Sequence, residues 1–501
     1  MHRHTGWTAR SPHRFSAWTA HGLRANSAPD EAATPYLGRT LRLLAPLLLS
    51  GCVAVPQLDP AQRVIEPQQF DADQALAAPL AEWPTDEWWH RYGDSQLDAL
   101  IAQGIAHAPT LAVAEARIRR AEARISNARS ANAPQIDAGA SFAQAKASYW
   151  NGVPYSGVPK GVNDAAAVRL SLDWTLDFFG RNRAAIAAAS SAAEAARAEG
   201  AQARLLLTTA IAGSYAGLLG EMREEALARA TLDARDRTAQ LVTQRREQGL
   251  ETLASEAQAR SAAETARLEL VQATEAIALT RLEIAELTGQ GPDQGLRIGR
   301  PAEPELPGFG LPSQIPADLI GRRPDLRAAR LRVEAQAAAI DQARAGFYPS
   351  INLSAFIGPQ ILGLDHIFDA GSIAGSAGPA IHLPIFHGGA LQAEYRGARA
   401  DYDEAVVVYN QTLLHALGET ARIVASLRSL EDQLAHALAA QEAAETAYTA
   451  ASARYRGGLL NYINVLSAEN MVIATRSTVN RLQTRRFELD VALVRALGGG
   501  V

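Results

Sequence analysis

The clearest hydrophobic pattern in the chain is a strict alternation over the 11 residues from Val168 to Phe178. Apolar residues occupy every second position, so an extended strand here has one apolar face and one polar face. A half-buried strand of a soluble sandwich has the same pattern. Eleven residues is also the length of a tilted strand that crosses a membrane. The segment therefore predicts a strand that meets an apolar medium on one side and water on the other.

Three further alternating runs predict three more strands. They comprise residues 135–142, Ile351 to Ile357, and the run of Ile381, Leu383 and Ile385. Four strands are too few to close a barrel, since about eight is the small end of the range. If these strands span a membrane, several copies of the chain must therefore combine to close the barrel.

Long stretches without proline predict unusually long helices. No proline occurs between Gly161 and Gly291, and none follows Pro384. A helix from Arg181 to Glu247 would extend roughly 100 Å at 1.5 Å per residue, which is too long for an ordinary compact domain. Its alanine-rich first part lets neighbouring helices approach closely on two sides. This combination favours a helix in the wall of a cylinder.

The chain is also a duplication. Residues 109–117 align with residues 324–332 at an offset of 215, and Gly249 aligns with Gly458 at an offset of 209. Each copy predicts a helix, two strands, a very long helix, a glycine-marked turn and a second long helix. We expect the chain to consist of five segments: a leader (1–51), an N-terminal segment (52–95), a first repeat (96–291), a linker (292–315) and a second repeat (316–501).

The N-terminal region has the features of a lipoprotein signal. A short apolar run from Leu41 to Leu49 follows Arg39, which is the size of a signal-peptide core. It leads into Leu49-Ser-Gly-Cys52, which resembles a bacterial lipobox, and Cys52 is the only cysteine. We therefore expect a lipid on Cys52 rather than a small buried side chain. Residues 1–38 precede this signal and favour a misplaced translation start over an unusually long leader.

Composition and motifs argue against two classes of function. The formal net charge of −5 gives no basic excess, so a nucleic-acid partner is not expected. The sequence contains no His-Glu-x-x-His, Gly-x-Ser-x-Gly or P-loop motif. His382 and His387 lie five residues apart near a strand end, and an odd spacing is expected to place them on opposite faces. We expect no catalytic residue, no metal and no cofactor.

Two sequence blocks resemble a known family. They run from Ile315 to Arg332, including Arg-Arg-Pro-Asp, and from Ala343 to Ser354. Support comes from the blocks that begin at Trp88 and Leu383 and from the terminal Ala496-Leu-Gly-Gly-Gly. From about Cys52 to its end the chain resembles TolC-like outer-membrane efflux lipoproteins of the NodT type.

The resemblance implies a mainly α-helical fold with a membrane β-barrel, in which three copies build one twelve-stranded barrel and a helical α-barrel. It implies a lipid-anchored protein of the outer membrane that extends into the periplasm and passively conducts small molecules outward. The implied partners are two further copies of the chain, outer-membrane lipid, a periplasmic adaptor (membrane fusion protein) and a proton-driven inner-membrane transporter. Two alternatives remain at this point: a channel for protein secretion and a soluble coiled-coil scaffold, which would leave the alternating segments unexplained.

The resemblance also points to two sets of site residues. Gly249-Leu250 and Gly458-Leu459 mark the helical turns, where glycine accepts a left-handed conformation and where the family docks its adaptor. Asn464 and Ser467 occupy positions at which some members carry aspartates around the periplasmic aperture. Neutral side chains there would close the aperture by hydrogen bonding and bind cations less well than carboxylates, or would be ordinary exposed helix residues.

Overall fold

The computed structural model describes most of the chain after the predicted leader. The described residues are 55–58, 60–66, 69–72, 74–148, 150, 160–304, 306, 308, 310–312 and 321–500. Cys52, the leader and the start of the Arg-Arg-Pro-Asp block lie outside these residues. Residues 53–501 form one compact unit that contains every helix and strand below.

The structure confirms the predicted order of elements in both repeats. The first repeat contains α3 (Pro109–Ser130), β1 (Gln135–Ala145), β2 (Asn163–Leu176), α4 (Arg181–Glu247) and α5 (Leu253–Leu287). The second contains α8 (Pro324–Ala345), β3 (Ser350–Leu362), β4 (Ile373–His382), α9 (Ala390–Arg456) and α10 (Tyr462–Leu497). The shorter elements are η2 (Trp88–Tyr92), α2 (Ser95–His107), α6 (Pro292–Gly295), η4 (Leu364–His366) and η5 (Ala370–Ser372). Helices α4 and α9 have 67 residues each, and the bounds of α4 match the predicted helix.

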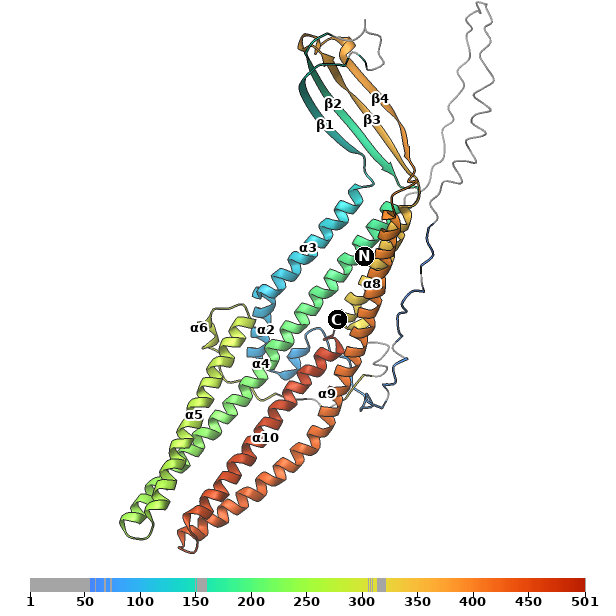
Figure 1. Ribbon diagram of the computed structural model, residues 1–501. Coiled ribbons are helices and arrows are strands. Elements are labelled where there is room, and N and C mark those ends of the chain that lie inside the picture. The colour runs from blue at the N-terminus through green and yellow to red at the C-terminus, as the bar shows by residue number, and fades with distance from the viewer. Residues whose placement is uncertain are drawn as a thin grey trace, which may run out of the picture. The chain divides into compact units, whose positions relative to one another are not determined.

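The long helices form a layer whose middle is α4 (Figure 1). In the half of the layer that is nearer the strands, the helices pack side by side in the order α3, α4, α8 and α9. In the half that is nearer the helical turns, the order is α5, α4, α10 and α9. Small residues permit close crossing, because a Cβ on Gly220 of α4 would come within 2.5 Å of Thr484 Oγ1 on α10. An 18-residue window of α4 is apolar enough for a membrane span, but 67% of it is buried within the chain. We therefore assign α4 to the helical layer.

The four strands form one antiparallel sheet in the order β1-β2-β3-β4, in which β2 and β3 join the two repeats. Leu172 pairs with Ile136 on β1 and with Ala355 on β3, and Ala355 pairs with Ala377 on β4. Directly paired residues share a face, so the apolar positions of all four strands form one continuous surface. Among the described residues, the outer edges of β1 and β4 pair with no other strand.

The predicted end of the second strand was wrong by two residues. Strand β2 ends at Leu176 and not at Phe178. The reason is the side chain of Asp177, which accepts hydrogen bonds from the backbone N–H groups of Asn182 (3.1 Å) and Arg183 (2.9 Å). Asp177 therefore satisfies free donors at the start of α4 instead of continuing the strand.

The predicted position of the fourth strand was also wrong in part. Of the three residues in the expected run, only Ile381 lies in β4, and Leu383 and Ile385 follow its end at His382. Pro384 lacks the N–H needed for a further ladder bond and ends the pairing. The strand instead extends back to Ile373 through small residues that give no strong alternation.

Each repeat closes on itself through a left-handed glycine. Gly289, after α5, has φ +69°, and a Cβ there would lie 2.5 Å from the carbonyl oxygen of His107. Gly498, after α10, has φ +95°, and its Cβ would lie 2.6 Å from the carbonyl oxygen of Arg322. The backbone after α5 thus packs directly against the residue that lies two positions before the proline at the start of α3. The backbone after α10 packs in the same way against the residue two positions before the proline at the start of α8. This contact explains the requirement for glycine at both positions.

The Arg-Arg-Pro-Asp block fixes the start of the second repeat. Arg323 is buried and donates to Asp325 (2.7 and 3.1 Å), to Glu419 on α9 (3.0 Å) and to the carbonyl oxygen of Ala496 on α10 (2.9 Å). The neighbouring Arg322 lies over the ring of Trp83, at 4.4 Å from its centroid. The block therefore anchors α8 to α9, to the end of α10 and to the N-terminal segment.

Candidate functional site

Both helical turns adopt the same glycine-dependent geometry. Gly249 and Gly458 have φ +74° and +75°, which confirms the predicted left-handed conformation. Leu250 and Leu459 each donate their backbone N–H to the carbonyl five residues earlier, at 2.8 and 2.9 Å. These bonds define a Schellman motif, which satisfies carbonyl groups at the end of a long helix.

The leucines after these glycines face outward. In many Schellman motifs the residue after the glycine packs back on the helix, but here 62% of Leu250 and 78% of Leu459 is exposed. Leu253 and Ile463, on the first turns of the following helices, are exposed as well. Both tips therefore present apolar side chains that the described chain does not cover.

A tyrosine connects the two tips. The hydroxyl of Tyr455, in the second hairpin, donates to Glu251 Oε1 in the first hairpin at 2.9 Å. Arg245, also in the first hairpin, lies over the Tyr455 ring. Burial and the bond to Glu251 raise the pKa of Tyr455 to about 12, so the hydroxyl remains a donor at neutral pH. Tyr455 and Tyr462 are buried with Val242 between the hairpins. Sequence analysis missed this link because Glu251 and Tyr455 lie in different repeats and share no local pattern.

The two aperture candidates lie on one side of α10, three residues apart. Asn464 and Ser467 are both exposed, and Asn464 Nδ2 donates to the carbonyl oxygen of Asn461 at 3.4 Å. The charged groups of this region lie deeper. Arg235 is buried and donates to Asn470 Oδ1 (2.7 Å), and burial raises the pKa of Glu469 while Arg235 opposes that shift.

The sheet separates apolar from polar side chains as the alternation predicts. Apolar-face residues are uncovered in the single chain, with exposed fractions of 63% for Ile136 and 70% for Ile381. On the other face Ser354 donates to Asp173 Oδ1 at 3.0 Å. Leu170, Leu172 and Trp174 thus share the apolar face, and Arg169, Ser171 and Asp173 share the polar face.

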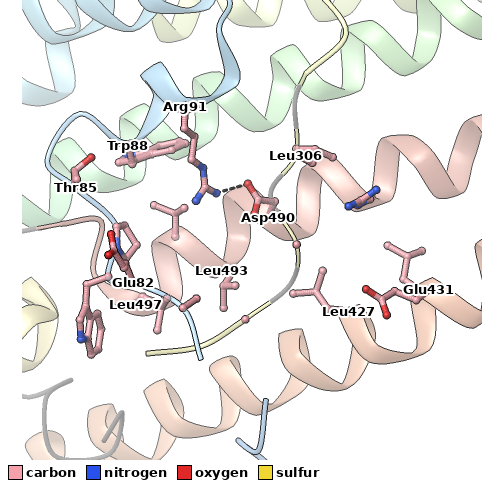
Figure 2. A pocket seen from close by; sticks show the side chains of 18 of the residues that line it. Glu82, Thr85, Trp88, Arg91, Leu306, Leu427, Glu431, Asp490, Leu493 and Leu497 are labelled. Carbon is pink, nitrogen blue, oxygen red and sulfur yellow. Dashed lines mark hydrogen bonds and ion pairs between the residues drawn. The ribbon is translucent and has the colours of Figure 1, made fainter. Parts of the chain in front are cut away.

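A cavity of about 900 Å³ lies between the N-terminal segment, the linker, α9 and α10 (Figure 2). Leu427, Leu493 and Leu497 line it, and an ion pair between Arg91 and Asp490 forms part of its wall (Figure 2). These groups offer packing and structural charge pairing, with no nucleophile held by a base.

Elsewhere in the described chain, no group of three His, Cys, Asp or Glu residues is arranged to hold a metal ion. The expectation that His382 and His387 lie on opposite faces was wrong, because their ring centroids are 6.4 Å apart. Strand β4 ends at His382, so the alternation on which that expectation rested does not reach His387.

Comparison with known proteins places these features in a family. The Outer membrane efflux protein family matches residues 100–290 and 315–499. The multidrug resistance outer membrane protein MdtP of Shigella flexneri is 30% identical over 460 residues, which cover 90% of this chain and 94% of that protein. The fusaric acid resistance protein FusA of Burkholderia cepacia is 36% identical over 367 residues, or 72% of this chain and 68% of that protein.

A solved structure shows the same architecture. The crystal structure of the outer membrane protein VceC from Vibrio cholerae matches with a TM-score of 0.78 and 40% sequence identity, over 83% of this chain and all of that chain. The family match includes both duplicated units with their strands and long helices. The chain therefore belongs to the outer membrane efflux protein family and is an outer-membrane efflux channel, not an enzyme.

Proposed function

We propose that three copies of this chain form the outer-membrane exit duct of a tripartite efflux pump. The observation that carries the proposal is a four-stranded sheet whose apolar face is not covered, and whose outer edges on β1 and β4 are not paired, by any part of the chain that the structure describes. Unpaired strand edges are not tolerated in the hydrocarbon of a membrane. Three sheets joined edge to edge give twelve strands and leave no free edge.

The helical layer supports the same arrangement. One edge of the layer is formed by α3 and α5 and the other by α9. Exposed apolar residues follow both edges: Leu268, Val271 and Leu279 on α5, and Val407 and Leu414 on α9. Packing α9 of one copy against α3 and α5 of the next buries these residues and closes the three layers into an α-barrel.

The two faces of the sheet then have different surroundings. The face with Leu170, Leu172 and Trp174 contacts lipid, and the face with Arg169, Ser171 and Asp173 lines a water-filled lumen. Substrates move passively along this lumen, and the pump supplies the driving force elsewhere.

The tips are the docking site in this proposal. Leu250 and Leu459, with their glycines, form the apolar surface that receives a periplasmic adaptor, which in turn contacts a proton-driven inner-membrane transporter. The Tyr455–Glu251 contact holds the two hairpins of one copy together near the tips. Asn464 and Ser467 ring the periplasmic aperture as neutral groups.

The remaining segments anchor and brace the duct. Residues 52–95 and the linker 292–315 form a belt around the helices, supported by Asp94, which accepts hydrogen bonds from Tyr215 on α4 (2.6 Å) and from the backbone of Ala302 (2.8 Å). The repeats span 96–291 and 316–501, and residues 1–51 are removed as the leader. A lipid on Cys52 anchors the mature chain to the outer membrane, from which the helices extend into the periplasm.

Family membership excludes the soluble scaffold as a function of this chain. Between the remaining cargo classes, the resistance names of MdtP and FusA favour small molecules over secreted proteins.

Mass spectrometry of the detergent-extracted complex tests the assembly and the anchor together. The native mass is expected to equal three copies, and the denatured chain to begin at an acylated Cys52. The Cys52→Ala variant, as control, should lose the acyl mass while remaining trimeric. A native mass of one or two copies would overturn the trimer, and an unmodified thiol on Cys52 would overturn the anchor alone.

A further inference from the structure

One large aromatic side chain interrupts the polar face of the sheet. Phe356 lies near the middle of β3, and its cross-strand partners on that face are Ser171 on β2 and Ser376 on β4. Both partners are small, so Phe356 projects beyond the side chains on either side of it. Phe356 is half-buried, and the small serines on either side leave part of its ring uncovered on the polar face.

Arg169 covers part of the Phe356 ring. Its guanidinium carbon lies 4.3 Å from the ring centroid, and the side chain is exposed. Gly139 is its partner on β1, and on β3 a Cβ at Gly358 would lie 3.1 Å from the Arg169 Cα. Glycine on both neighbouring strands leaves the surroundings of the guanidinium open.

Among the described residues, the guanidinium is also not paired with a carboxylate. No ion pair to Arg169 occurs within the part of the chain that the structure describes. Of the carboxylates on the same face, Asp137 lies diagonally across on β1 without such a pair, and Asp173, four residues along β2, accepts a hydrogen bond from Ser354. An arginine that lies against an aromatic ring, and is not paired with a carboxylate, keeps its planar set of N–H donors available to bind an anion. The pair thus combines a free anion-binding fork with an adjacent aromatic surface.

We propose that Arg169 and Phe356 form a weak binding station for planar aromatic carboxylates in the lumen. The inference rests on the proposed function, in which the polar face lines the duct. The carboxylate accepts paired hydrogen bonds from the guanidinium, and the ligand ring stacks on the guanidinium or against Phe356. Three copies place three such stations around one lumen. Weak binding suits conduction, because a site in a channel must release what it attracts.

We expect the station to bind three small probes with different affinities. Benzoate offers both a carboxylate and an aromatic ring, cyclohexanecarboxylate offers the same charge without the ring electrons, and benzamide offers the ring without the charge. Benzoate is therefore expected to bind several-fold more tightly than either of the others.

Ligand-observed saturation-transfer NMR on the detergent-solubilised full chain measures this order without requiring conduction. Arg169→Gln should reduce benzoate binding to the level of benzamide. Arg169→Lys keeps the charge but not the planar fork, and should lose most of the preference. Phe356→Leu should equalise benzoate and cyclohexanecarboxylate. Thr175→Ser, on the same face of β2, is the matched control and should behave as the unchanged chain.

The outcomes separate this inference from the proposed function. Equal binding of the three probes by the unchanged chain, or unchanged binding in Arg169→Gln and Phe356→Leu, overturns the station and leaves a conducting trimer intact. Failure of the unchanged chain to form a trimer or to pass current would overturn the proposed function, and with it the lumenal station.

Discussion

Leu172→Arg is expected to prevent stable insertion of the chain into the outer membrane, and Ser171→Arg to be tolerated. Leu172 lies in the interior of the sheet, between Ile136 and Ala355 on the apolar face. An arginine on the lipid face near the bilayer midplane costs about 2–4 kcal/mol in a transmembrane barrel, and a trimer contains three of them. An arginine at Ser171 faces water in the lumen and pays no such cost.

The measurement is the amount of trimer in purified outer membranes that resists extraction by urea. Ser171→Arg is the matched control, because it introduces the same side chain one residue away on the opposite face. Equal amounts of urea-resistant trimer for the two variants would contradict the assignment of the apolar face to lipid.

The Leu250→Asp, Leu459→Asp double substitution is expected to abolish efflux while the trimer still assembles. Burying a leucine contributes about 1.5–3 kcal/mol relative to leaving it exposed, and a trimer presents six of these tip side chains. Carboxylates at the same places must be desolvated when an apolar partner docks. Both leucines are mostly exposed in the chain itself, so their replacement removes little internal packing.

Drug susceptibility of cells that depend on this channel measures the effect, with trimer abundance followed in the same cells. Leu296→Asp is the control, because Leu296 is 57% exposed but lies next to α6, away from the tips. Full resistance in the double variant at normal trimer abundance would exclude the tips as the docking site.

The features that could be predicted from the sequence are those that local patterns determine. The bounds of α4 follow from the absence of proline and the capping glycines on either side, and the left-handed turns follow from Gly249 and Gly458. The alternation in β2 places its side chains correctly because side-chain direction in a strand has a period of two. The duplication then transfers each of these predictions to the second repeat.

The features that could not be predicted depend on contacts between distant residues. The Tyr455–Glu251 bond crosses from one repeat to the other, and Arg323 reaches Glu419 on a different helix. The Arg169–Phe356 pair becomes visible only through the register of β2 against β3. Strand ends were misplaced for a related reason, since Asp177 serves the following helix and not the strand that its alternation continues.

Single-channel recording in planar lipid bilayers tests the central claim most directly. The purified full chain, reconstituted without adaptor, transporter or energy source, should produce discrete steps of ion current whose size is set by a trimeric lumen. Covalent cross-linking of the three copies should leave the step size unchanged. Absence of current steps although trimer is inserted in the bilayer would contradict the account of this chain as a passive outer-membrane duct.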